Sequence, residues 1–168
     1  MNADFSGDAK FMDADFSGRA NFGHANFKRD ASFKDAEFDG GADFRYADFS
    51  GYADFRCAEF KKGADFEDID LTEVDFRDAA LRGANFERTI LSRATLIDAD
   101  LRGAHLSGAV MTDARINDET KLLSPPVNDL PLRAYVPAEL LKLDTARRTV
   151  GTRLWLRRRV HASGDFGR

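Results

Sequence analysis

Acidic side chains next to phenylalanine are the most frequent groups in this chain that could do chemistry. Asp or Glu stands directly before Phe many times, and paired carboxylates commonly act as general acids and bases. Other reactive groups are sparse: three scattered histidines and one cysteine, Cys57, with no phosphate-binding loop, nucleophile elbow or metal-ligand spacing. We therefore expect no metal centre, disulfide framework or cofactor, and we predict that the protein is not an enzyme.

These carboxylates belong to an internal repeat. Fourteen of the 15 phenylalanines lie between Phe5 and Phe86. An eleven-residue unit holding Ala-x-Phe twice occurs six times, so that the phenylalanines are spaced alternately six and five apart. From Phe66 the central apolar residues are strictly five apart as far as Ile116, and nearly every one has Ala two positions before it. The role of these carboxylates therefore depends on the fold that the repeat forms.

Neither a helix nor a straight strand can use this spacing. A step of five residues rotates the next side chain by ~140° around a helix, so no single face collects the phenylalanines. In a straight strand an odd spacing would turn every second one to the opposite face. The pattern works if each unit is a short strand followed by a turn, which predicts a β-solenoid. Glycine suits such turns, and it stands at Gly7, Gly18, Gly40, Gly51, Gly83, Gly103 and Gly108.

The run ADLRG-AHLSG, with ANFER before it, resembles the pentapeptide-repeat family, whose consensus is Ala-Asp/Asn-Leu/Phe-x-x. The resemblance covers Ala3 to Asp118 and implies an all-β fold, a right-handed quadrilateral β-helix with one pentapeptide on each side. It also makes the Asp before each central residue part of the consensus, which favours a structural interpretation of that carboxylate. The first six units carry one extra residue in every second repeat, and with four sides these insertions stack on two opposite corners: Asp8, Arg19, Asp30, Gly41, Tyr52 and Gly63.

The outward residues follow from the same register. The second and third faces are expected to carry ladders of opposite charge, such as Asp54 and Asp75 beside Arg56 and Arg77. On the first face Asp48 and Asp70 are expected to have no base in their columns. With Asp43 and Asp65 on the neighbouring fourth face, they are the candidate partner-binding residues. Three outward apolar residues are expected to be covered by another segment, namely Ile90 and Val110 on the first face and Ile97 on the second.

The repeat and the residues after it divide the chain into four predicted segments. Residues 3–118 are predicted to form the β-helix, 119–136 a Pro-containing linker, 137–160 a C-terminal cap or dimerisation segment, and 161–168 a flexible tail. Pro137 and the late arginines favour a helix, although the alternation around Val150 also fits a strand or two short helices. The apolar residues expected to contact Ile90, Ile97 and Val110, within one chain or across a homodimer, are Leu140, Leu143, Leu154 and Trp155.

Charge divides unevenly along the chain. Residues 1–118 hold 15 Lys/Arg and 24 Asp/Glu, a net charge of −9, whereas residues 119–168 hold 10 and 5, a net charge of +5. Arg157–Arg159 could meet nucleic acid, anionic lipid or an acidic partner, or could pair within their own protein. The rod itself is not expected to bind nucleic acid, and no apolar run is long enough to span a membrane. A cytoplasmic location is expected because the N-terminus has no signal-peptide pattern.

Two functions fit these observations. One is a non-catalytic protein–protein interaction module whose partner the sequence does not identify. The other comes from the resemblance alone, because some pentapeptide-repeat proteins are acidic mimics of DNA that bind DNA gyrase, a type II topoisomerase. The net charge of −9 agrees with such mimicry, while the interspersed Lys and Arg ladders favour the general interaction module.

Overall fold

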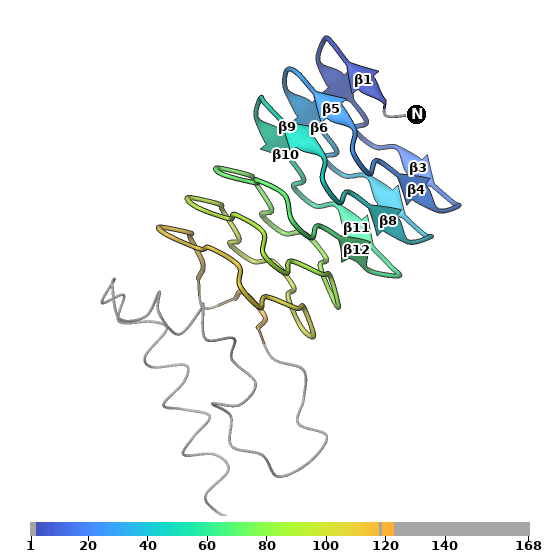
Figure 1. Ribbon diagram of the computed structural model, residues 1–168. Helices are drawn as coiled ribbons and strands as arrows, with labels where there is room; N and C mark the ends of the chain where they lie inside the picture. The colour runs from blue at the N-terminus through green and yellow to red at the C-terminus, as the bar shows by residue number, and fades with distance from the viewer. Residues whose placement is uncertain (1–2, 118, 123–168) are drawn as a thin grey trace, which may run out of the picture.

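The computed structural model describes residues 3–117 and 119–122 (Figure 1). The predictions for the rest of the linker, for residues 137–160 and for the tail lie outside the described residues. The same holds for the predicted contacts of Leu140, Leu143, Leu154 and Trp155.

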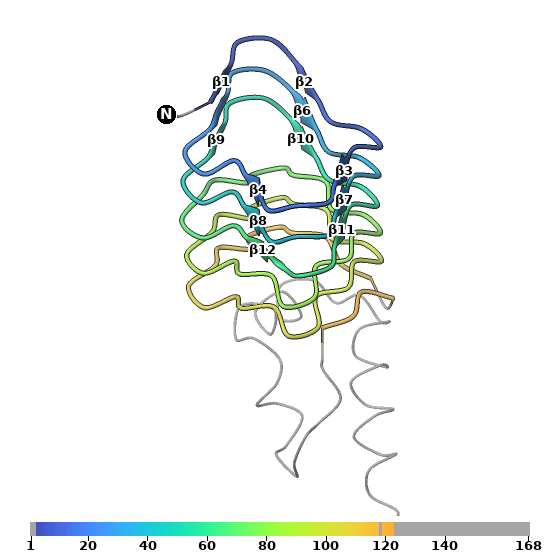
Figure 2. The same ribbon diagram turned by 90° about the vertical axis from the view of Figure 1, so that its right-hand side faces the viewer.

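The described chain winds into stacked coils with four strands per coil in the first half (Figure 2). Each strand is two residues long: it holds either the outward and the central residue, as Asp4–Phe5 does, or Ala and the outward residue, as Ala9–Lys10 does. All pairing is parallel, within four three-stranded sheets ordered β1-β5-β9, β2-β6-β10, β3-β7-β11 and β4-β8-β12. The strands are β1 (Asp4–Phe5), β2 (Ala9–Lys10), β3 (Asp15–Phe16), β4 (Ala20–Asn21), β5 (Asn26–Phe27), β6 (Ala31–Ser32), β7 (Glu37–Phe38), β8 (Ala42–Asp43), β9 (Asp48–Phe49), β10 (Ala53–Asp54), β11 (Glu59–Phe60) and β12 (Ala64–Asp65).

The predicted four-sided β-helix and its register are confirmed. Asp4 pairs with Asn26, 22 residues further on, whereas Asp70 pairs with Ile90, 20 residues further on. The difference of two residues per coil is the pair of insertions, which lie at diagonally opposite corners as predicted. After β12 each face is held by isolated parallel bridges, and the last of these pairs Asp100 with Lys121. Backbone pairing therefore continues past residue 118, the predicted end of the β-helix.

The core consists of columns of stacked phenylalanine rings. Within one column, the rings of Phe27 and Phe49 are 4.7 Å apart and inclined by 8°. This separation matches the ~4.8 Å spacing of strands, so the backbone ladder imposes the ring stacking. Rings of different columns meet edge to face, as Phe33 and Phe44 do at 5.3 Å. Burying each such ring contributes roughly 1.5–3 kcal/mol to folding, against the entropy of ordering the chain.

Glycines serve the corners in two different ways. Gly83 has a φ of 66°, in the left-handed region expected for a turn that redirects the chain. Gly40 does not have a positive φ; a Cβ atom there would lie 2.4 Å from the backbone oxygen of Gly18 in the preceding coil. Gly51 is equally close to the backbone of Arg29. Of the glycines predicted for turns, Gly7, Gly18, Gly40 and Gly51 have no positive φ, so the prediction that turn geometry requires glycine is wrong for these four. Gly40 and Gly51 instead permit close stacking of the six-residue corners.

Candidate functional site

The carboxylate before each central residue makes the same local hydrogen bond on several faces. It accepts the backbone N–H of the residue two positions on, at 3.1 Å from Arg45 to Asp43 and at 2.9 Å from Thr72 to Asp70. Asn85 accepts the Glu87 amide in the same way at 3.1 Å. A short polar side chain that satisfies a turn amide explains why Asp or Asn recurs at this position. The hydrogen bonding thus assigns this position a structural role in the turn.

On the second, third and fourth faces an arginine two residues on folds back onto this carboxylate. Arg77 Nη2 donates to Asp75 Oδ2 while its Nε also donates to the same carboxylate at 2.9 Å. Burial alone would raise the pKa of Asp75, but hydrogen bonds from Arg77 and from Tyr52 hold that pKa below its usual value. The predicted charge ladders are confirmed on the second face by this fork and that of Arg56 with Asp54, and on the third face by Arg102 with Asp100. The fourth face, for which no ladder was predicted, has the same fork between Arg45 and Asp43.

The first face, defined as the sheet β1-β5-β9 and its continuation through Asp70, Ile90 and Val110, lacks this fork. Two positions after Asp48 and Asp70 stands a hydroxyl residue, at the position that arginine has in the forks. The Thr72 hydroxyl donates to Asp70 Oδ1 at 2.6 Å, and the Ser50 hydroxyl donates to Asp48 Oδ1 at 3.3 Å. No described basic side chain forms an ion pair with either carboxylate, so both present an uncompensated charge at the surface.

Two corrections apply to the acidic stripe predicted from the sequence. Asp43 is 5% exposed and is bound by the Arg45 fork, and Arg45 Nε also lies 3.3 Å from Asp65 Oδ2. These two carboxylates of the fourth face are therefore charge-compensated, which leaves Asp48 and Asp70. The first face also contains one base, Lys28, in the column of Ser50 and Thr72, and it pairs with Asp4 at 2.8 Å.

Exposed apolar side chains gather around the first face. Ile90 and Val110 are bridged neighbours on it, 38% and 47% exposed. Tyr46 and Tyr52 stand at its two bordering corners, 50% and 45% exposed. Ile97 is partly buried and lies on the second face, as the register predicts, so it does not extend this surface. Uncompensated carboxylates and exposed apolar groups thus share one side of the rod.

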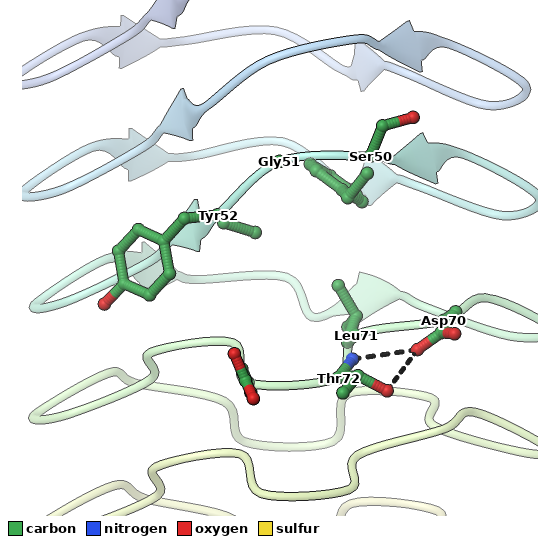
Figure 3. A pocket seen from close by; sticks show the side chains of 9 residues that line it. Ser50, Gly51, Tyr52, Asp70, Leu71 and Thr72 are labelled. Atoms are coloured by element: carbon green, nitrogen blue, oxygen red, sulfur yellow. Dashed lines mark hydrogen bonds between the residues drawn. The ribbon is translucent and has the colours of Figure 1, made fainter.

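A cavity of about 380 Å³ opens on the first face where the coils change length (Figure 3). Its upper wall is the six-residue corner Ser50–Tyr52, and its lower wall is the five-residue turn from Asp70 to Glu73. The extra residue of the upper corner has no counterpart below, so a gap remains. At the opposite corner a Cβ atom added to Gly63 would lie 3.4 Å from the backbone oxygen of Gly83, so the two coils lie near each other there. We call this the step cavity. The step cavity was not predicted from the sequence, although the switch from alternate to strict spacing of the central residues marks its place.

The remaining reactive groups of the described chain show no catalytic arrangement. His24 stacks on Tyr46 with ring centres 4.9 Å apart. Burial, followed by a hydrogen bond with Asp35, raises the pKa of the exposed Cys57 thiol, which disfavours the nucleophilic thiolate. Among the described residues there is no group of three His, Cys, Asp or Glu side chains that could hold a metal ion. The same residues contain no helix with the length and hydropathy of a membrane span.

Comparisons with known proteins agree with this architecture. Two family models described as pentapeptide repeats match, one at residues 1–37 and 22–70, the other at residues 62–88 and 89–118. Rfr23, a pentapeptide repeat protein from the cyanobacterium Cyanothece 51142, superposes with a TM-score of 0.55 at 16% identity, over 71% of this chain and 87% of its own. That likeness shows the fold, a right-handed quadrilateral β-helix.

Two further solved structures are similar over most of their length. A pentapeptide repeat protein from Nostoc PCC 7120 is 31% identical over 70% of this chain and 82% of its own, with a TM-score of 0.34. QnrB1, a plasmid-mediated fluoroquinolone resistance protein, is 16% identical over 82% of this chain and 97% of its own, and its TM-score of 0.26 supports no functional argument. No curated protein matches the sequence.

Proposed function

This chain belongs to the pentapeptide-repeat family, and from that premise we propose that it is a non-catalytic protein–protein interaction module that binds its partner through the first face. The observation that carries the proposal is the grouping on one face of two uncompensated carboxylates, Asp48 and Asp70, with the exposed side chains of Ile90 and Val110. On the other faces the corresponding carboxylates of Asp43, Asp54 and Asp75 are neutralised by arginine forks. Contiguous exposed apolar groups bordered by polar ones are typical of protein interaction sites.

The test is capture of a partner from lysate of the cells that express the protein. The double variant Ile90→Ser and Val110→Ser should lose a protein that the wild type retains. The matched control replaces Glu59 and Arg82, two exposed residues of the third face, with Ser and should retain it. A partner lost equally from both variants, or from neither, would contradict binding through the first face. The cytoplasmic location is likewise a proposal, which fractionation of the same cells checks.

The alternative function is an acidic mimic of DNA that binds DNA gyrase. A mimic must offer a row of charges comparable with the one phosphate per ~1.7 Å of DNA axis. Of the four carboxylates predicted to form such a row, Asp43 and Asp65 are paired with Arg45, so only Asp48 and Asp70 support the alternative. If mimicry holds, the protein inhibits gyrase supercoiling in a salt-sensitive way, and replacing Asp48 and Asp70 with Asn abolishes the inhibition. Absence of inhibition at large molar excess in low salt would remove this alternative.

A further inference from the structure

We propose that the step cavity binds one arginine side chain of the partner protein, and that an apolar residue of the same partner segment covers Ile90 and Val110. This inference rests on the proposed function and specifies the chemistry that the first face would recognise. It concerns the side of the rod where the cavity is lined by the free carboxylate of Asp70 (Figure 3). Ile90 and Val110 continue the column of Asp70 on the same face.

The rod's own arginine forks indicate what is missing at Asp70. Where the residue two positions on is arginine, its guanidinium occupies both oxygens of the carboxylate, as Arg56 does on Asp54 at 2.8 and 2.7 Å. At Asp70 the backbone N–H and the hydroxyl of Thr72 both use Oδ1, and no described residue donates to Oδ2. A guanidinium supplied by another chain would restore on this face the interaction that the other faces make internally.

The walls of the cavity favour arginine over a smaller cation. A volume of about 380 Å³ is near the lower limit for ligand pockets, which suits one long side chain. Ser50 and Gly51 line the wall opposite Asp70, so a long side chain can lie between the two coils with its guanidinium at the carboxylate. The other acidic group of the wall, Glu73, already pairs with Arg93 at 2.8 Å. Asp70 is therefore the anchoring carboxylate.

The position of the apolar column sets the spacing of the partner segment. Ile90 is bridged to Asp70 and Val110 is bridged to Ile90, so each lies one coil, ~4.8 Å, further along the rod. An extended peptide advances ~3.3 Å per residue, so the residue two positions after the arginine lies ~7 Å along and falls between Ile90 and Val110. The expected recognition element is thus Arg-x-Φ in an extended segment, where Φ is Ile, Leu or Val.

The experiment is a titration of the full ¹⁵N-labelled chain with acetyl-Ala-Arg-Ala-Ile-Ala-amide, followed by NMR. Saturable shifts are expected at the amides of Ser50, Thr72 and Glu73. The same peptide with citrulline in place of arginine keeps the shape but removes the charge, and it should bind at least tenfold more weakly. Asp70→Asn should weaken the arginine peptide by about tenfold, which is ~1.4 kcal/mol.

A matched control separates the cavity from general charge attraction. Asp15→Asn makes the same charge change in a similar local triplet on the third face, because Asp15-Phe16-Ser17, like Asp70-Leu71-Thr72, is an Asp followed by a central apolar residue and a hydroxyl residue. It should change the affinity less than twofold. Asp70→Asn is expected to fold normally, since Asn85 accepts the turn amide at the equivalent position.

Three results would overturn the inference: no saturation at about 10 mM peptide, equal binding of the citrulline peptide, or equal losses in Asp70→Asn and Asp15→Asn. If any of these occurs while the captured partner still depends on Ile90 and Val110, the arginine site fails and the proposed function stands. If capture also proves independent of the first face, the proposed function fails with it.

Discussion

The hydroxyl of Tyr52 donates a hydrogen bond of 3.0 Å to Asp75 Oδ2, joining the last six-residue corner of the first face to the coil that follows it. Tyr52 is the inserted residue of that corner, and Asp75 is also held by Arg77. The bond therefore crosses the place where the coils change length, beside the step cavity.

Removing this hydroxyl should weaken the junction between the two kinds of coil. Tyr52→Phe keeps the ring and loses the bond to a charged acceptor, for which we expect a loss of about 1 kcal/mol in the free energy of unfolding. The value stays small because Arg77 continues to compensate Asp75. Urea unfolding of wild type and variant measures it. An unchanged midpoint would show that the bond does not contribute to stability.

The same bond predicts a pH dependence on the alkaline side. Burial, with the hydrogen bond to Asp75, raises the pKa of Tyr52 from 10.0 to about 12. Because the folded-state pKa lies above the unfolded one, this contribution is complete below pH 10 and is lost as the pH rises towards 12. Thermal melts from pH 9 to 12 should therefore show a decline that is smaller in Tyr52→Phe. Parallel declines in the two proteins would contradict the assignment to Tyr52.

Close stacking of the six-residue corners gives a prediction with a built-in control. Gly40→Ala places a methyl group 2.4 Å from the Gly18 backbone oxygen and should cost ~1–3 kcal/mol in the free energy of unfolding. Gly18→Ala changes the equivalent residue one coil earlier, where nothing lies within 4 Å, and should be nearly neutral. Denaturant unfolding compares the two. Equal losses in the two variants would show that the close approach of Gly40 to the Gly18 backbone does not determine the cost of the added methyl group.

The repeat predicts most of this fold because its geometry leaves few choices. Spacing alone excludes a helix and a straight strand. The paired insertions determine which corners are wider, and inserted residues of successive coils lie above one another: the backbone N–H of Tyr52 donates a 2.9 Å hydrogen bond to Asp30 Oδ1. The charge ladders also follow from counting, since Asp54 and Arg56 are only two residues apart.

The candidate site could be predicted only in part, because it depends on which hydrogen bonds and ion pairs each carboxylate forms. Asp43 and Asp48 look alike in sequence, yet Arg45 neutralises the first while Ser50 leaves the second charged. The triplet Asp-x-Arg against Asp-x-Ser was the available signal. The step cavity depends on how two coils of different length stack, as does the close approach of Gly40 to Gly18, and single-residue patterns do not encode either distance.

The last prediction concerns Ile90 and Val110 and the residues after Leu122. If Leu140, Leu143, Leu154 and Trp155 cover this column or the end of the core, within one chain or in a homodimer, a chain ending at Leu122 should expose apolar surface and aggregate. Adding Ile90→Ser and Val110→Ser to the truncated chain should restore much of its solubility if the column is what was covered. Sedimentation and binding of a hydrophobic dye measure both effects, and full-length protein at several concentrations separates a cap from a dimer. A truncated chain that stays monomeric, soluble and equally stable would leave the column free for a partner protein.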